Sequence, residues 1–157
     1  MRRLFIQSLL SLIVLSARRS ANAAAFELPQ AVALNRAVGP FFYLIIFATK
    51  SCPWCALLKR DYLAHLPTQS DGVAIQMLEV MIDREHPLID FKGLATSHKR
   101  FAKDLAVRVS PTVMAFSSAG IRLGEPLIGI GIADFYGAYL DGLVQLGVQS
   151  QRGAPSR

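Results

Sequence analysis

Two cysteines separated by two residues are the side chains of this sequence best suited to chemistry. They lie in Cys52-Pro53-Trp54-Cys55, shortly after the continuous apolar run Phe41–Ala48. That run predicts a strand buried on both faces, and the residues after Pro53 have helical spacing. The cysteines would therefore open a helix, with Pro53 at its first position, where a missing backbone N–H costs nothing.

This placement predicts different properties for the two thiols. Unpaired N–H groups and the helix dipole favour an anion at a helix N-terminus. The Cys52 thiolate should therefore be stabilised, with a pKa below the roughly 8.5 of a free thiol. Cys55 lies one turn further on, against the apolar strand, and should be less exposed. We expect Cys52 to attack a substrate disulfide and Cys55 to resolve the mixed disulfide.

Other uses of a Cys-x-x-Cys pair fit the sequence less well. Haem attachment needs a histidine after the second cysteine, and that residue is Ala56. A structural zinc site needs four ligands, and only the isolated His65, His86 and His98 accompany the pair. We expect these histidines to be surface residues. A structural disulfide would close almost no loop and would gain little from chain entropy.

The rest of the chain predicts one α/β domain over residues 26–149, in which a central mixed sheet is flanked by helices. Because a helix separates the first two strands, these strands should be parallel. The last two strands should form a hairpin. The expected helices are Phe26–Val38, Pro53–His65, Thr96–Ala106 and Ala133–Leu146, and the further strands are Val73–Ile82, Val113–Ser117 and Arg122–Ile130.

The strand–Cys-x-x-Cys–helix unit, followed by a Pro-Thr pair before a hairpin, resembles the thioredoxin superfamily. The resemblance covers roughly residues 41–146 and implies a thioredoxin-like fold. It also implies that Cys52 and Cys55 form a redox-active disulfide. The matching residues are FATKSCPWC at Phe47–Cys55, MID at Met81–Asp83, LAVRVSPTVMAF at Leu105–Phe116, Gly120 and Gly129.

The resemblance also implies a substrate-binding loop. In the family, the proline that corresponds to Pro111 is cis and faces the two cysteines. The backbone of Ser110 would then pair with an extended substrate strand. Trp54 would be a large aromatic beside the reactive sulfur, where it either docks substrate or packs against the rim of its own domain.

Two features depart from cytoplasmic thioredoxin. Its buried acid, which moves protons at the resolving thiol, is replaced here by Ile46. Glu79 is a candidate substitute, although a strand carboxylate that faces solvent is the simpler expectation. The stretch Asp83–Arg100 is longer than in thioredoxin and predicts a helical insertion before Pro111. It is similar to the stretch in exported thioredoxin-like proteins associated with bacterial sulfur oxidation.

The N-terminal residues predict export to the periplasm. A positive start, the apolar run Leu4–Ala17, and small residues at Ala21 and Ala23 are typical of a signal peptide over residues 1–23. An uncleaved N-terminal membrane anchor is the alternative, but the run of about 14 residues is short for a bilayer span, which needs roughly 20. Export would place the cysteines in an oxidising compartment.

The charge distribution argues against a nucleic-acid partner. The formal net charge is +6, and removal of residues 1–23, with their four arginines, would reduce it to +2. A nucleic-acid footprint usually needs a concentrated basic patch, and the only basic cluster is His98-Lys99-Arg100 with Lys103. We expect a monomer, with residues 150–157 as a flexible polar tail.

These features favour an exported thiol:disulfide oxidoreductase that reduces disulfides in client proteins. The Pro-Trp dipeptide lacks the histidine between the cysteines that is typical of strong oxidants. The resemblance implies a membrane thiol reductase of the DsbD or CcdA type as electron donor, and we expect no cofactor or metal. The alternatives are a disulfide donor or isomerase, a redox-regulatory subunit, or a module that binds copper or another soft metal through Cys52 and Cys55.

Overall fold

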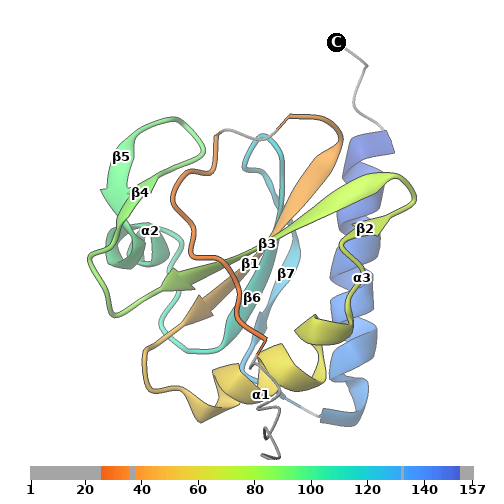
Figure 1. Cartoon of the computed structure of the whole chain (residues 1–157), viewed down its shortest axis with the longest axis horizontal. Helices are drawn as coiled ribbons and strands as arrows, with labels where there is room; N and C mark the ends of the chain where they lie inside the picture. Colours follow the sequence, from red (N-terminus) through yellow and green to blue (C-terminus); the bar gives the residue numbers. More distant parts are fainter. Residues whose placement is uncertain (1–25, 36–37, 132, 153–157) are drawn as a thin grey trace, which may run out of the picture.

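A mixed five-stranded sheet forms the centre of the computed structural model, which describes residues 26–35, 38–131 and 133–152 (Figure 1). Its strand order is β2-β3-β1-β6-β7. Strand β1 is parallel to β3 and antiparallel to β6, and β6 forms a hairpin with β7, so the predicted sheet is confirmed. The strands are β1 Phe41–Ala48, β2 Gln69–Ser70, β3 Val73–Met81, β6 Thr112–Ser117 and β7 Arg122–Ile128.

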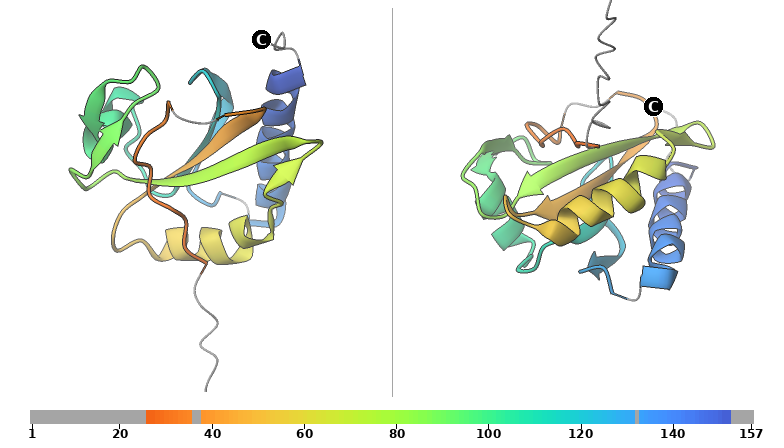
Figure 2. Two further views of the ribbon diagram at one scale, coloured as in Figure 1. Left: turned by 45° about the horizontal axis from the view of Figure 1, so that its top comes forward. Right: turned by 60° about the horizontal axis from the view of Figure 1, so that its bottom comes forward.

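Helices cover both faces of this sheet, as expected for the predicted fold class. Helices α1 and α3 pack on one face and α2 packs on the other (Figure 2). Because successive residues of β1 point to opposite faces, both of which are covered, all of its side chains are buried. The helices are α1 Pro53–Asp61, a short 3-10 turn η1 Leu63–His65, α2 His98–Asp104 and α3 Ala133–Arg152.

The expected helix over Phe26–Val38 is wrong for the residues that the structure describes. Residues 26–35 form an extended segment, here called the N-terminal strap. The Ala31 N–H donates to the Glu79 carbonyl, and the Glu79 N–H donates to the Pro29 carbonyl, each at 2.9 Å. The strap thus pairs with β3 along the edge that β2 covers only at Val73 and Ala74, and it satisfies the backbone N–H and carbonyl groups of Glu79.

The expected helical insertion before Pro111 is only partly correct. Helix α2 is present, but the stretch before it forms a small hairpin of β4 Pro87–Ile89 and β5 Ala95–Ser97. The carboxylate of Asp90 accepts hydrogen bonds from the N–H groups of Lys92 and Leu94. An aspartate that bonds the backbone just after itself stabilises a turn rather than a helix.

The chain ends differ from expectation at one boundary. Helix α3 continues to Arg152, so the predicted start of the tail at residue 150 falls inside a helix. Residues 153–157 and the predicted signal peptide at 1–23 lie outside the described residues. Among the described residues, no helix is both long and apolar enough to cross a bilayer.

Gly147 brings α3 close to β1, and we expect Gly147→Ala to destabilise the fold by about 2 kcal/mol. A Cβ at this position would overlap the ring of Phe42, which is fully buried. Gly142 on the same helix has nothing within 4 Å of an added Cβ. Gly142→Ala should therefore stabilise by up to about 1 kcal/mol through helix propensity. Urea unfolding of both variants checks this, and equal changes would refute the close packing.

Candidate active site

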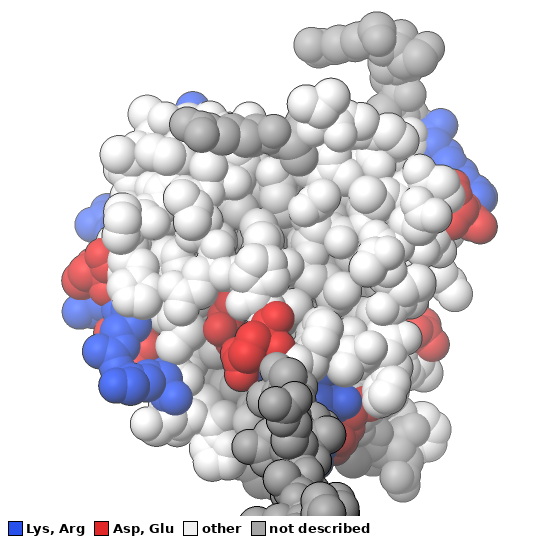
Figure 3. All heavy atoms as spheres, in the orientation of Figure 1, with Lys and Arg blue, Asp and Glu red and all other residues white. Residues whose placement is uncertain are grey.

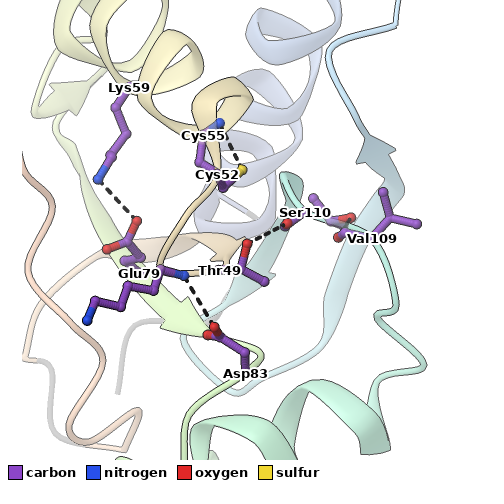
Figure 4. Close-up of a disulfide and its surroundings, with 10 residues drawn as sticks. Thr49, Cys52, Cys55, Lys59, Glu79, Asp83, Val109 and Ser110 are labelled. Atoms are coloured by element: carbon purple, nitrogen blue, oxygen red, sulfur yellow. Dashed lines mark hydrogen bonds and ion pairs between the residues drawn. A yellow bond between two sulfur atoms is a disulfide. The ribbon is translucent and has the colours of Figure 1, made fainter.

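Cys52 and Cys55 form a disulfide at the N-terminus of α1, with their Cα atoms 5.2 Å apart (Figure 4). Cys52 is the N-cap residue, and its sulfur accepts a hydrogen bond from the Cys55 N–H at 3.0 Å. Pro53 occupies the first turn, as the sequence predicts. The sulfur of Cys52 therefore lies where a helix N-terminus stabilises negative charge.

The two cysteines differ in exposure, as expected. Cys55 is only 3% exposed and packs against Ala48 and Met81, whereas Cys52 is half-buried. A substrate can therefore approach Cys52 and not Cys55. This asymmetry matches a nucleophile and a resolving thiol.

A loop from a distant part of the chain borders the disulfide. The Ser110–Pro111 peptide bond is cis. The hydroxyl groups of Thr49 and Ser110 are hydrogen-bonded at 3.1 Å, which joins this loop to the turn before Cys52 (Figure 4). The Pro111 carbonyl also accepts a hydrogen bond from the Gly129 N–H at 2.8 Å.

An open cleft of about 510 Å³ lies between this loop and α1. Trp54, Ser110 and Pro111, the three residues expected to bind substrate, all line it, together with Val109 and residues 129–131. Trp54 is 60% exposed, so its ring is available to a partner. The structure thus gathers the predicted substrate-binding residues around one cleft beside Cys52.

Glu79 is buried, contrary to the simpler expectation of a carboxylate that faces solvent. It is the register partner of Ile46 on the neighbouring strand and lies on the face covered by α1. The Lys59 ammonium contacts the Glu79 carboxylate at 3.3 Å (Figure 4). It also contacts the Glu27 carboxylate at 2.9 Å. Burial lowers the pKa of Lys59, but the attraction of the two carboxylates outweighs it and leaves this pKa raised.

The Lys59–Glu79 ion pair lies next to the resolving cysteine. Cys55 and Lys59 are one helical turn apart on α1, and Met81 and Glu79 point to the same face of β3. Cys55 contacts Met81, so the ion pair is the adjacent contact between the same two elements. Among the described residues, Glu79 is the only buried carboxylate.

His98 is buried, so the expectation that the histidines are surface residues is wrong at this position. Its Nδ1 accepts a hydrogen bond from the Met81 N–H at 2.9 Å, which places the ring proton on Nε2. Nε2 then donates to the Ala31 carbonyl at 2.6 Å. His98 thereby joins the N-terminal strap to Met81, which packs on Cys55. The local sequence holds no signal for this role, because both partners are distant.

We expect the stability of the protein to fall as the pH drops below about 6.5. Burial lowers the pKa of His98 from its ordinary 6.5, so the unfolded state binds more protons in this range. The contribution of His98 is therefore complete above about pH 6.5 and is lost below it, by at most about 1.4 kcal/mol per pH unit. Protonation of His98 at Nδ1 would also place this proton against the Met81 N–H and break the hydrogen bond between them.

Urea unfolding between pH 5 and 8 measures this effect. In His98→Gln the corresponding part of the pH dependence should vanish, whereas the exposed His65→Gln should keep it. If His98→Gln retains the full pH dependence, another group is responsible.

Comparisons with known proteins bear on the fold. No protein-family model matches the chain, and no curated protein sequence matches it. A thioredoxin-fold protein from Helicobacter pylori aligns with 78% of this chain and 80% of its own, at 18% identity and a TM-score of 0.51. Thioredoxin f from spinach chloroplast aligns with 80% of this chain and 96% of its own, at 18% identity and a TM-score of 0.46.

At such identities the likeness shows the fold alone, and this conclusion rests on the Helicobacter pylori structure. The mixed sheet, the Cys52–Cys55 disulfide at the start of α1 and the cis Ser110–Pro111 bond are the features of this chain that the sequence resemblance implies. The chain therefore has the thioredoxin-like fold that its sequence resemblance implies.

Proposed function

We propose that the protein is an exported thiol:disulfide oxidoreductase that reduces disulfides in client proteins. The observation that carries this proposal is the asymmetry of the pair: a half-buried Cys52 sulfur that caps α1 and a Cys55 that is 3% exposed. A disulfide that closes so short a loop stabilises the folded state little by reducing the entropy of the unfolded chain. The same two sulfurs stay close in both redox states, which suits reversible electron transfer.

The proposed reaction has two exchange steps. The Cys52 thiolate attacks one sulfur of a client disulfide, a Cys52–client bond forms, and the other client sulfur leaves and takes up a proton. Cys55 then loses its proton and attacks the Cys52 sulfur, which releases the second client thiolate. Two electrons have passed to the client, and the Cys52–Cys55 disulfide must be reduced by a donor dithiol.

The surroundings of the disulfide support each step. The Cys55 N–H points at the Cys52 sulfur and would stabilise its thiolate. Trp54, Ser110 and Pro111 line the adjacent cleft, where an extended client segment would lie. The apolar N-terminus and small residues of the predicted signal peptide support export. An exported reductase needs an electron donor, and the resemblance implies a membrane thiol reductase of the DsbD or CcdA type.

Glu79 is our candidate to accept the proton of Cys55. Glu79→Gln should slow the release of client from the mixed disulfide by at least about tenfold, because general-base help is lost. The first attack by Cys52 should keep its rate. Stopped-flow mixing with a peptide disulfide separates the two steps, and Glu125→Gln, an exposed position, is the control. Unchanged release in Glu79→Gln would exclude this role.

The reduction potential of the pair tests the function and its direction. We would equilibrate the purified protein in glutathione or dithiothreitol buffers and measure the fraction of disulfide. A value near about −270 mV supports a reductase, and a value near about −120 mV would make the protein a disulfide donor. Absence of a reversible couple would contradict the proposal and favour binding of a soft metal by the two thiols.

A further inference from the structure

Three hollows that share lining residues extend from the cleft beside the candidate disulfide to α2. Val109 lines both the cleft beside Trp54 and a second hollow of about 250 Å³. Arg108 lines this second hollow and also a third, of about 460 Å³, against α2. We call the second and third hollows together the furrow. Because each hollow shares lining residues with the next, one extended segment bound at the cleft would be able to contact all three.

Of the residues that the structure describes, basic side chains and no acidic ones line the furrow. Arg122 lines its near part, Lys99 and Lys103 line its far part, and Arg108 lines both. Its remaining lining is mostly apolar and includes Val107. The furrow thus combines an apolar surface with a row of positive charges.

These cations are largely unpaired, which sets them apart from the rest of the surface. Lys99 contacts Glu85 at 3.2 Å, and the face drawn in Figure 3 shows basic and acidic side chains next to one another. Within the described ranges, only five lysines and arginines form no ion pair, and three of the five line the furrow. The five are Lys50, Lys92, Lys103, Arg108 and Arg122.

We propose that the furrow binds an acidic segment of the client, close in sequence to the cysteine that Cys52 attacks. The inference rests on the proposed exchange reaction and names the class of substrate. Unpaired cations over an apolar surface are complementary to an extended segment that carries both apolar and acidic side chains. Such complementarity raises the rate of encounter and selects among partners more than it raises affinity.

Three synthetic peptides test the substrate class on the unaltered protein. Each is a disulfide-linked homodimer around one cysteine, and the flanking positions are glutamate, glutamine or lysine. The measured quantity is the second-order rate constant for their reduction by the reduced protein. At low salt the glutamate peptide should react about tenfold faster than the lysine peptide, with the glutamine peptide between them. At 1 M salt, where the Debye length is about 3 Å, this difference should largely disappear.

A matched pair of variants locates the effect. Arg108→Glu should lower the rate with the glutamate peptide about threefold or more relative to the rate with the glutamine peptide. Lys92→Glu makes the same change of charge at an unpaired cation outside the furrow and should have no such effect. Equal rates for the three peptides, or equal effects of the two variants, would overturn the inference. Failure to reduce even the glutamine peptide would instead refute the proposed reaction.

Discussion

Replacing Cys52 by alanine should reduce the rate of disulfide exchange by at least about three orders of magnitude. Cys52 presents the half-buried sulfur at the start of α1, and Cys55 is 3% exposed. Cys55 cannot replace Cys52 as the nucleophile, because its thiol is buried and a substrate disulfide cannot approach it. Reduction of a glutamine-flanked peptide disulfide by Cys52→Ala measures the loss directly.

The structure supplies a control for this variant. Cys52→Ala removes the sulfur that caps α1, so its stability must be measured beside its activity. Cys52→Ser keeps a side-chain acceptor for the Cys55 N–H and should fold at least as well as the alanine variant while being equally inactive. If either variant retained substantial exchange activity, Cys55 would have to be the attacking thiol.

Replacing Cys55 by alanine should have the opposite kinetic signature. Cys52 can still attack, but nothing resolves the mixed disulfide, so the protein should accumulate covalently bound to its substrate. With a peptide disulfide we expect about one adduct per protein and very slow release. Mass spectrometry of the acid-quenched reaction counts the adducts, and added dithiothreitol should release them.

The same variant can identify the physiological client. Because Cys55→Ala holds its partner through a disulfide, trapped proteins can be released with dithiothreitol and identified. If the furrow binds an acidic segment of the client, the client cysteines that become linked to Cys52 should have acidic residues nearby in the sequence. If Cys55→Ala turned over like the unaltered protein, the roles assigned to the two cysteines would be wrong.

The sequence by itself determined the centre of the fold and the reactive pair. The run Phe41–Ala48 is apolar and rich in β-branched and aromatic residues, which is typical of a strand covered on both faces. Pro53 after Cys52 favours the start of a helix, and the structure has the helix there. These signals are local, since each depends on residues that are neighbours in the chain.

Tertiary structure decided the features that depend on partners far away in the sequence. The N-terminal strap has helix-like spacing of buried residues, at Leu28, Ala31 and Leu34, yet it is extended because its backbone pairs with β3 and β4. The hairpin before α2 differs from the strap, because it is a local feature: the Asp90 carboxylate accepts hydrogen bonds from the N–H groups of two residues that follow it, a turn signal that the expectation of a helical insertion overlooked.

Partners far away in the sequence also explain what the sequence missed around the site. The burial of His98 depends on Met81 and Ala31, and the burial of Glu79 depends on Lys59 of α1. The furrow likewise draws its cations from three places, α2, the loop after it and β7. Spacing within a single helix or strand records which residues face the core. It does not record which charged or polar partner meets them there, because that contact is made only when distant segments pack together.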